Sequence, residues 1–383
     1  MPKRIKDEYE IIAELGTGGM ATVYKAVQRS LNRPVAIKEL KKAYQTDSRV
    51  VQRFEREAKM AASFQHENIV HIYDYLAQPD HAIVMEYVDG STLAWIIEET
   101  GALPTDVGVM IGLQVASALE YAHSRGLIHR DIKPGNIMVK RNGEVKLMDF
   151  GIARLREMES LTLPGILMGT PSYMSPEQIM GQPLDARSDI FSFGIVLYEM
   201  FTGIKPFPEE EANSSNSKIL KGKFPSPRSI YSDIPRSLQR IIKKCLKTKP
   251  HKRYGSMQEL ARALGKRIKG MDKPASLKRI SDHLVDVQVF AAPPENEKVA
   301  ISQAPGMGTF TKMLLAAAGT ILLLSASIGY YYITKATQLR IPQKMQTMPL
   351  LSQPPAAQSG TMPASQPTPT ARSAATGTES ITK

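Results

Sequence analysis

Short apolar runs alternate with turn residues along the first part of the chain, the pattern typical of β-strands. Strands are predicted over residues 9–15, 22–27, 35–38, 66–75 and 81–87. Residues 48–64 instead have the longer repeat of an amphipathic helix. The pattern therefore predicts a strand-rich first part with a single long helix.

After residue 90 the pattern becomes mainly helical, with one interruption. Helices are predicted over residues 93–99 and 105–125, and a strongly apolar helix begins at Asp189. Between them, residues 137–139 and 145–148 form two apolar runs around an Asn-Gly turn. This spacing predicts a β-hairpin.

The C-terminal part changes character, and the folded domain is expected to end near Gly270. Residues 271–311 are polar and rich in Pro, Ala and Ser, which predicts a linker. Residues 313–333 carry no charge and end in three tyrosines, so a transmembrane helix is predicted over 312–334. Residues 335–383 are a low-complexity tail that is expected to be disordered.

Composition allows a substantial hydrophobic core, and the cysteine count is consistent with a reducing compartment for the folded part. The chain has 383 residues, 42% of them hydrophobic, and one cysteine, Cys245, which excludes an intramolecular disulfide. The net charge is +12, but no aromatic and basic surface for nucleic acid is visible, so no nucleic-acid partner is expected. The basic cluster from Lys243 to Arg279 suits a solvated helical face, one that could lie close to anionic lipid.

Two stretches contain the polar side chains that are candidates for catalysis. They are His-Arg-Asp-Ile-Lys-Pro-Gly-Asn, residues 129–136, and Asp149-Phe150-Gly151 after the hairpin. Pro134 and Gly135 favour a rigid loop there. Two acids and an amide close together suit phosphoryl transfer, which needs oxygen ligands for a metal and a carboxylate for the acceptor hydroxyl. These motifs resemble the catalytic loop and metal-binding triplet of bacterial-type, membrane-anchored serine/threonine protein kinases.

The resemblance implies a role for each polar residue of these motifs. Asp131 would be the catalytic base, and Lys133 would neutralise charge near the transferring phosphate. Asn136 and Asp149 would bind Mg²⁺, with Mn²⁺ as a substitute, and ATP would be the phosphate donor. The implied fold is α+β and two-lobed: an N-lobe (9–87) with a small antiparallel sheet and one helix, and a larger helical C-lobe (91–270).

A glycine-rich stretch lies near the N-terminus, after an eight-residue polar tail (1–8). By itself it suits a dinucleotide-binding turn or any hairpin, but it continues as a strand rather than a helix. The kinase resemblance makes it the loop over the ATP phosphates, which consists of Leu15, Gly16, Thr17, Gly18, Gly19, Met20, Ala21, Thr22 and Val23. Ala21 replaces the third glycine of the family pattern.

Further ATP contacts follow from the same resemblance. Lys38 would contact the α- and β-phosphates and be held by Glu57, with Glu55 as the alternative acid. Backbone groups of Glu86 and Val88 would bind the adenine edge.

The segment between Gly151 and Ser175-Pro176-Glu177 corresponds to an activation loop. Thr162 is the preferred phosphorylation site and Ser160 the second choice, with Arg130 available to pair with the added phosphate. Thr170 is expected to make a structural contact. Asp189 and an Arg253–Glu177 pair would be scaffold, and His123 is expected to be structural.

The sequence thus predicts a single-pass kinase that phosphorylates Ser/Thr hydroxyls of proteins and of its own activation loop. Dimerisation through the predicted span is a further hypothesis. Flanking charges leave the orientation open, but the need for ATP puts the kinase domain in the cytoplasm and the tail outside the inner or plasma membrane. Two alternatives are a pseudokinase that binds nucleotide without transfer, and a kinase-fold enzyme acting on a small molecule.

Overall fold

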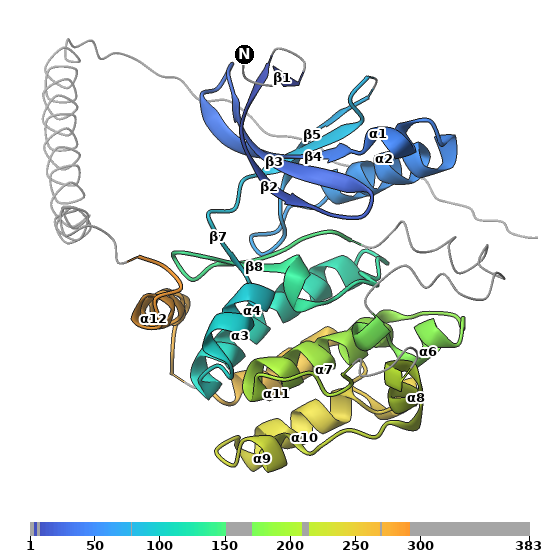
Figure 1. Cartoon of the computed structure of the whole chain (residues 1–383). Coiled ribbons are helices and arrows are strands. Elements are labelled where there is room, and N and C mark those ends of the chain that lie inside the picture. The colour runs from blue at the N-terminus through green and yellow to red at the C-terminus, as the bar shows by residue number, and fades with distance from the viewer. Residues whose placement is uncertain are drawn as a thin grey trace, which may run out of the picture. The chain divides into compact units, whose positions relative to one another are not determined.

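The fold is taken from a computed structural model, which describes residues 4–5, 8–77, 79–150, 171–208, 214–268 and 270–291. Two compact units divide the chain, residues 1–294 and 295–383, and every described residue belongs to the first. Within that unit a β-rich N-lobe lies above a helical C-lobe (Figure 1). The two-lobed α+β architecture predicted from the sequence is confirmed.

The N-lobe is an antiparallel sheet of six strands in the order β1-β2-β3-β4-β6-β5. Helix α2 packs against it beside β5. The elements are β1 Arg4–Ile5, β2 Tyr9–Thr17, β3 Ala21–Gln28, β4 Arg33–Leu40, β5 Ile72–Leu76, β6 Ala82–Glu86, α1 Lys42–Gln45 and α2 Ser48–Ala62.

Helix α2 forms because its sequence supplies both a cap and a buried stripe. The Asp47 carboxylate accepts a hydrogen bond from the Arg49 N–H, which satisfies one free amide at the helix start. Phe54, Ala58 and Ala61 recur at helical spacing and are buried against the sheet. The packed stripe fixes the rotation of α2, and with it the direction of every other side chain on the helix.

The C-lobe surrounds α7, an almost completely buried helix. It is buried on all sides, as expected for a central helix, with mostly apolar side chains and a few polar ones such as Asp189 and Glu199. Gly194 allows close approach to Cys245 of α10. The elements are β7 Gly90–Thr92, β8 Ile137–Lys140, β9 Val145–Leu147, α3 Leu93–Thr100, α4 Thr105–His123, α6 Pro176–Ile179, α7 Ala186–Thr202, α8 Ser214–Lys221, α9 Pro227–Ile230, α10 Arg236–Cys245, α11 Met257–Gly265, α12 Lys273–Asp286, and the 3₁₀ turns η1 Pro134–Asn136, η3 Pro171–Tyr173 and η4 Pro250–Lys252.

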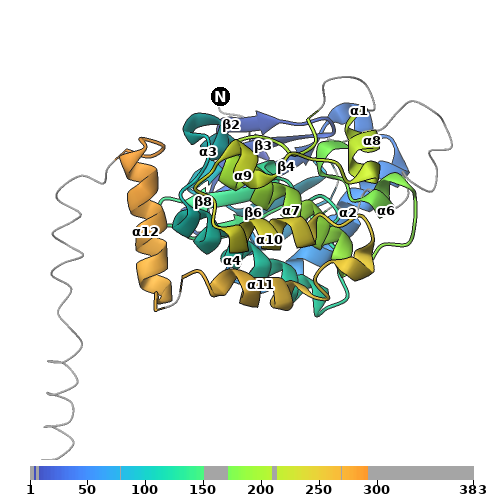
Figure 2. The ribbon, with the colours of Figure 1, turned by 90° about the horizontal axis from the view of Figure 1, so that it is seen from below.

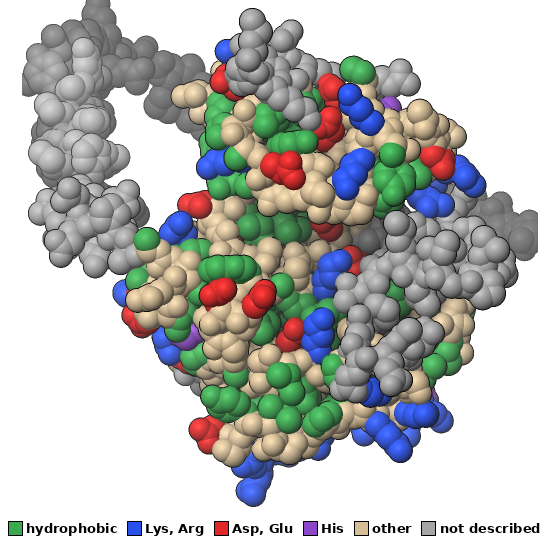
Figure 3. Space-filling model, viewed as in Figure 1, with side chains coloured by type: hydrophobic (Ala, Val, Ile, Leu, Met, Phe, Trp, Pro, Cys, Tyr) green, Lys and Arg blue, Asp and Glu red, His purple; other side chains and the backbone are tan. Residues whose placement is uncertain are grey.

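Helices α9, α10 and α11 form the end of the C-lobe that lies opposite the N-lobe. They face the viewer when the unit is seen from below (Figure 2). Lys and Arg side chains gather along this end of the molecule (Figure 3).

The strand predicted over 66–75 is wrong in its first half, because β5 begins only at Ile72. The preceding residues form a loop between the lobes. In this loop the Asn68 side chain donates to the Val145 carbonyl oxygen at 2.9 Å, and the Asn68 carbonyl oxygen accepts from the Leu147 N–H. Bonding to the C-lobe therefore replaces strand pairing here.

The predicted linker also needs correction, because helix α12 occupies its start. Ile280 and Leu284 of α12 are fully buried and, with Phe290 beyond it, belong to the C-lobe core. Arg279 donates to Asp106 of α4 at 2.7 Å. The polar composition of 271–311 concealed two apolar residues at helical spacing.

With α12 in place, the core of residues 1–294 is closed. Arg141 lies over the Phe290 ring, and Ser281 of α12 donates to the Arg141 carbonyl oxygen at 2.6 Å. A domain with its own closed core folds independently. The unit 1–294 can therefore be studied by itself.

Several predictions fall on residues outside the described ranges. These are the phosphorylation sites Ser160 and Thr162, the contact of Thr170, the span 312–334 and the tail 335–383. In the described part of the chain, every helix is too short or too polar to cross a bilayer.

Leu284→Ala is expected to lower the unfolding free energy of residues 1–294 by about 2–5 kcal/mol, because it leaves a cavity between α12 and the C-lobe. Val287→Ala, at a side chain that is 38% exposed, should cost about 0.5 kcal/mol or less. Urea unfolding of both variants measures the difference. Equal small losses would show that α12 does not belong to the core.

Candidate active site

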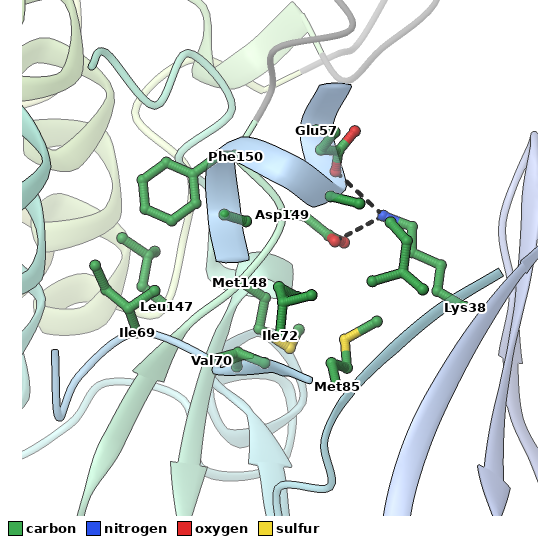
Figure 4. A pocket seen from close by; sticks show the side chains of 13 residues that line it. Lys38, Glu57, Ile69, Val70, Ile72, Met85, Leu147, Met148, Asp149 and Phe150 are labelled. Atoms are coloured by element: carbon green, nitrogen blue, oxygen red, sulfur yellow. Dashed lines mark hydrogen bonds and ion pairs between the residues drawn. The ribbon is translucent and has the colours of Figure 1, made fainter. Parts of the chain in front are cut away.

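Elements from both lobes meet around Lys38, which lies on β4 (Figure 4). Glu57 reaches it from α2, and Asp149 reaches it from the segment after β9. Lys38 Nζ lies 2.7 Å from Asp149 Oδ1 and 3.6 Å from Glu57 Oε1. Glu57 rather than Glu55 is therefore the partner of Lys38, and Glu55 pairs with Lys59 on the outer face of the helix.

Burial and charge oppose each other in this triad. Burial acts to lower the pKa of Lys38, but the carboxylates of Asp149 and Glu57 raise it above its ordinary value. Burial also raises the pKa of Glu57 to about 7, against the attraction of Lys38. For Asp149 the Lys38 ammonium outweighs burial and holds the pKa below its ordinary value. The lysine is thus a fixed cation, and Asp149 a fixed anion.

The loop before β8 brings three more polar side chains together. Lys133 Nζ lies 3.0 Å from Asp131 Oδ2, and Asn136 Nδ2 donates to the same oxygen at 3.1 Å. Asn136 Nδ2 also donates to the Asp131 carbonyl oxygen at 2.8 Å. These contacts hold the Asp131 carboxylate in one orientation.

The backbone of this loop is fixed by a buried carboxylate on α7. Asp189 accepts from the His129 N–H at 2.7 Å and from the Arg130 N–H at 2.9 Å. His123 Nε2 lies 2.7 Å from the same carboxylate, so His123 is structural, as predicted. Arg130 has a φ of 67°, a strained conformation that this bonding maintains.

An aromatic contact joins the loop to Asp149 and α2. The His129 ring lies 4.6 Å from the Phe150 ring, which lies 5.2 Å from Phe64 just beyond α2. Burial lowers the pKa of His129, and its neutral ring bonds the Met148 carbonyl oxygen through Nε2 at 3.0 Å. The sequence analysis assigned no role to His129 and Phe64, although His129 was part of the motif.

Asn136 and Asp149 fit a divalent metal ion. The Asn136 amide nitrogen donates to Asp131, and among the residues that the structure describes its side-chain oxygen has no hydrogen bond, so this oxygen can bind a ligand. Lys38 takes one oxygen of Asp149, and the 41% exposed side chain keeps the other open to the cleft. Because Mg²⁺ binds few protein oxygens and completes its shell with water and phosphate, this pair suits it.

The glycine-rich turn between β2 and β3 leaves space for a ligand. A side chain added at Gly16 or Gly19 would meet no atom within 4 Å. The turn is closed by the Gly18 N–H, which donates to the Ala21 carbonyl oxygen at 2.9 Å. Open backbone at this turn is what close approach to a phosphate requires.

Glu86 lies at the start of the connection between the lobes, and hydrogen bonds to its side chain hold it in place. Lys146 donates to Glu86 Oε2 at 2.8 Å, and the His71 N–H donates to the same oxygen at 3.3 Å. Val88 is buried two residues later. No local pattern indicates the Lys146–Glu86 pair, because the two residues lie sixty positions apart.

An apolar cavity lies behind the Lys38–Glu57 pair (Figure 4). Besides that pair it is lined by Ala58, Ala61, Ile69, Val70, Ile72, Ile83, Met85, Leu147, Met148, Asp149 and Phe150. Met85 lies at the position where the connection between the lobes begins. Its apolar lining keeps water away from one side of the ion pair. This burial is the cause of the raised pKa of Glu57.

A second ion pair supports the floor of the site. Arg253 binds both oxygens of Glu177 at 2.7 and 2.8 Å, and both side chains are buried, as the sequence predicted for this pair. Gln178, next to Glu177, donates to the Arg130 carbonyl oxygen at 2.8 Å. Sequence reasoning missed Gln178, which caps α6 and ties it to the catalytic loop.

Known proteins with similar sequences agree with this geometry. The model of the protein kinase domain matches residues 9–264. The chain belongs to the protein kinase family. Its kinase domain is 40% identical over 259 residues to the serine/threonine-protein kinase PrkC of Bacillus subtilis, covering 67% of this chain and 40% of that protein.

Other bacterial relatives and solved structures give the same result. A probable serine/threonine-protein kinase of Clostridium perfringens is 42% identical over 281 residues, 73% of this chain and 41% of that protein. The chain spans about two fifths of the length of these curated relatives. The crystal structure of the Mycobacterium tuberculosis PknI kinase domain matches with a TM-score of 0.55 and 27% identity, over 68% of this chain and 96% of that one.

The raised pKa of Glu57 predicts a pH-dependent stability. In the folded protein this carboxyl takes up a proton near pH 7, whereas in the unfolded chain it does so near its ordinary value of 4.5. Folding therefore binds a proton between these values, and the associated stability is lost as the pH rises toward 7. Relative to Glu57→Gln, the wild-type unit 1–294 should become less stable from pH 5 to pH 8.

Urea unfolding of both proteins, without nucleotide, at several pH values measures this difference. The comparison with the variant removes the contribution of other titrating groups. A constant difference would show that the carboxyl titrates at its ordinary value.

Proposed function

We propose that this protein is a serine/threonine protein kinase that transfers the γ-phosphate of ATP to hydroxyl groups of proteins. The arrangement of Asp131 carries the proposal: a carboxylate held by Lys133 and Asn136, beside the cleft that contains Lys38 and Asp149. A carboxylate in this position can orient a hydroxyl and accept its proton as the new bond forms. Lys133 lies where it can neutralise negative charge on the phosphoryl group during transfer.

The donor nucleotide would lie between the glycine-rich turn and the connection between the lobes. Val88 makes no backbone hydrogen bond to other described residues, and its N–H and C=O are available to an adenine edge together with the Glu86 carbonyl. Residues 15–23 would cover the phosphates. Lys38, a fixed cation, would bind the α- and β-phosphates after exchanging its contact with Asp149.

Asn136 and Asp149 would hold Mg²⁺, which supplies charge neutralisation on the phosphates when bound. The protein's own contribution is then mostly positioning of the donor, the acceptor and the charged groups around them.

Activation by phosphorylation between residues 151 and 170 is part of the proposal. Arg130 Nε is buried and has no hydrogen-bond partner among the described residues. A buried guanidinium nitrogen without an acceptor can be satisfied by a phosphate on Thr162 or Ser160. The segment would then be ordered beside Asp131, in a reaction between two copies of the chain.

Anchoring in the inner or plasma membrane completes the proposal. Residues 313–333 are uncharged, and their length matches the hydrocarbon core of a bilayer. The kinase domain would be cytoplasmic, where ATP is available, and residues 335–383 would lie on the other side. In this arrangement the protein would act in signalling across the membrane.

Asp131→Asn is expected to lower the kinase rate about 10²–10⁴-fold, because it removes the proton acceptor. Lys38→Met should abolish phosphate transfer, whereas Asp282→Asn, at an exposed carboxylate of α12, should leave it unchanged. Labelled ATP with Mg²⁺ and a generic protein substrate measures the rates, and mass spectrometry maps the sites on the chain itself.

Phosphate on Thr162 or Ser160, and a rate per molecule that rises with protein concentration, would support transfer between two copies. A rate that is constant on dilution would contradict the dimer. If the wild type binds ATP in a thermal-shift assay but transfers nothing, the protein is a pseudokinase instead. Transfer only to small-molecule acceptors would point to a different class of kinase-fold enzyme.

The full chain is expected to remain in the membrane pellet after an alkaline carbonate wash, while residues 1–294 stay in the supernatant. A protease added to intact spheroplasts should remove an epitope placed after residue 383 and leave an N-terminal epitope intact. Release of the full chain by carbonate would exclude the span, and the reverse protection pattern would invert the proposed orientation.

A further inference from the structure

Almost all of the net charge of the chain lies in one short part of the C-lobe. Residues 236–268 contain eleven Lys or Arg and a single acid, Glu259, a net charge of +10 against +12 for the entire chain. This part comprises α10, η4 and α11, the end of the C-lobe opposite the N-lobe. The rest of the protein is close to neutral.

The basic residues of α10 form a stripe on its outer face. Arg236, Arg240 and Lys243 recur at helical spacing, and Lys247 continues the same line just beyond the helix. The opposite face of α10 is buried in the core. Packing of the apolar face therefore requires the basic stripe to face outward.

Neighbouring segments extend the stripe at both ends. Arg267 donates to Ser237 Oγ at 2.6 Å, which places the exposed end of α11 beside the start of α10. At the other end, exposed Lys249 and Lys252 belong to the turn around η4. Figure 3 shows Lys and Arg gathered along this end of the unit. We call this surface, residues 236, 240, 243, 247, 249, 252, 266 and 267, the basic face.

The basic face has little internal neutralisation. Within residues 236–268, Lys244 pairs with Glu259, and Arg253 is committed to the buried Glu177. Among the residues that the structure describes, no carboxylate lies within ion-pairing distance of any member of the basic face. Uncompensated cations on one face create a positive field that attracts an extended anionic surface.

Two exposed apolar side chains lie beside the basic face. Ile230 is 39% exposed and Tyr231 is 51% exposed, at the end of α9. Gln239 of α10 accepts from Ser226 Oγ at 2.6 Å and from the Arg228 N–H at 3.3 Å, which fixes α9 against α10. An aliphatic and a tyrosine side chain next to cations match the composition of surfaces that enter the headgroup region of a bilayer.

We infer that the basic face binds an anionic phospholipid bilayer. The kinase domain would then lie on the membrane with α9 and α10 facing the lipid headgroups. The inference rests on the membrane anchoring of the proposed function. The twenty residues between 291 and the predicted span reach at most about 70 Å when extended, so the tether permits this contact. The site around Lys38 and Asp149 is lined by residues of both lobes and by none of α10, so this contact leaves it accessible to protein substrates.

A lipid surface fits the basic face better than a nucleic acid does. Single-stranded nucleic acid needs several aromatic platforms between the cations, and the duplex needs an element that enters a groove. Tyr231 is the one exposed aromatic side chain beside the basic face in the described part of the C-lobe end. A flat stripe with apolar residues at its edge is suited to a planar anionic surface.

The test uses residues 1–294, which lack the predicted span, so that vesicle binding and membrane anchoring can fail independently. Wild-type protein should co-sediment with phosphatidylcholine vesicles that contain about 30% phosphatidylglycerol and not with pure phosphatidylcholine vesicles. Binding should disappear between about 50 mM and about 500 mM salt, as electrostatic screening grows.

Two variants that lose the same number of positive charges distinguish an effect of the basic face on vesicle binding from an effect of the total net charge. The stripe variant, which should bind the anionic vesicles at least about tenfold more weakly, carries Arg236→Gln, Arg240→Gln, Lys243→Gln and Lys247→Gln. The control, which should bind like the wild type, removes four exposed cations of the N-lobe, with Lys42→Gln, Arg49→Gln, Arg56→Gln and Lys59→Gln. Equal weakening of both variants would overturn the inference.

A third variant separates lipid from nucleic acid. Ile230→Ser with Tyr231→Ser should weaken vesicle binding and leave the binding of a labelled DNA or RNA duplex unchanged. Duplex binding that is tighter than vesicle binding and depends on the same stripe would overturn the inference in favour of a nucleic-acid surface. Binding to neutral vesicles as strong as to anionic ones would also overturn it.

Discussion

The Asp189 carboxylate, buried at the start of α7, is the point to which the active site is attached. It accepts the N–H groups of His129 and Arg130 and contacts His123, so one charged side chain satisfies groups from two other segments. A buried carboxylate is tolerated only with such a set of partners. The same bonds maintain the left-handed conformation of Arg130, which directs the next residue, Asp131, toward the cleft. The position of the proposed base is thus set by the most deeply buried helix of the protein.

Lys38 links the two lobes through ion pairs. Its ammonium group contacts Glu57 of the N-lobe and Asp149 of the C-lobe, so the ion pairs form only when α2 and the segment after β9 are both in place. Burial raises the pKa of Glu57 to about 7, so the charge on this partner of Lys38 depends on pH near neutrality. The Phe64–Phe150–His129 contact links the same two segments through apolar packing. Together they make catalytic geometry dependent on the position of α2.

Charge is distributed unevenly because catalysis and surface binding make different demands. In the cleft, cations and anions alternate at close range, so their fields largely cancel outside the site. On the basic face, repulsion among like charges is tolerated because the side chains are exposed and screened by salt. Like charges side by side repel one another, so their accumulation on one face is consistent with a role toward a partner. Docking on a bilayer would also bring the cleft to a fixed height above the membrane.

The sequence alone determined the fold class, the order of most elements and the identity of the residues in the cleft. The order of the elements follows from local patterns of apolar periodicity and turn residues. The fold class and the roles of Asp131, Lys133 and Asn136 follow from the resemblance of their motif to that of protein kinases. Tertiary structure decided what depends on contacts between distant segments. It selected Glu57 over Glu55 by the rotation of α2, added α12 to the core through two buried residues, and paired Lys146 with Glu86. It also gathered α9, η4 and the end of α11 around the stripe of α10. Such choices depend on which faces meet, and a linear pattern does not contain that information.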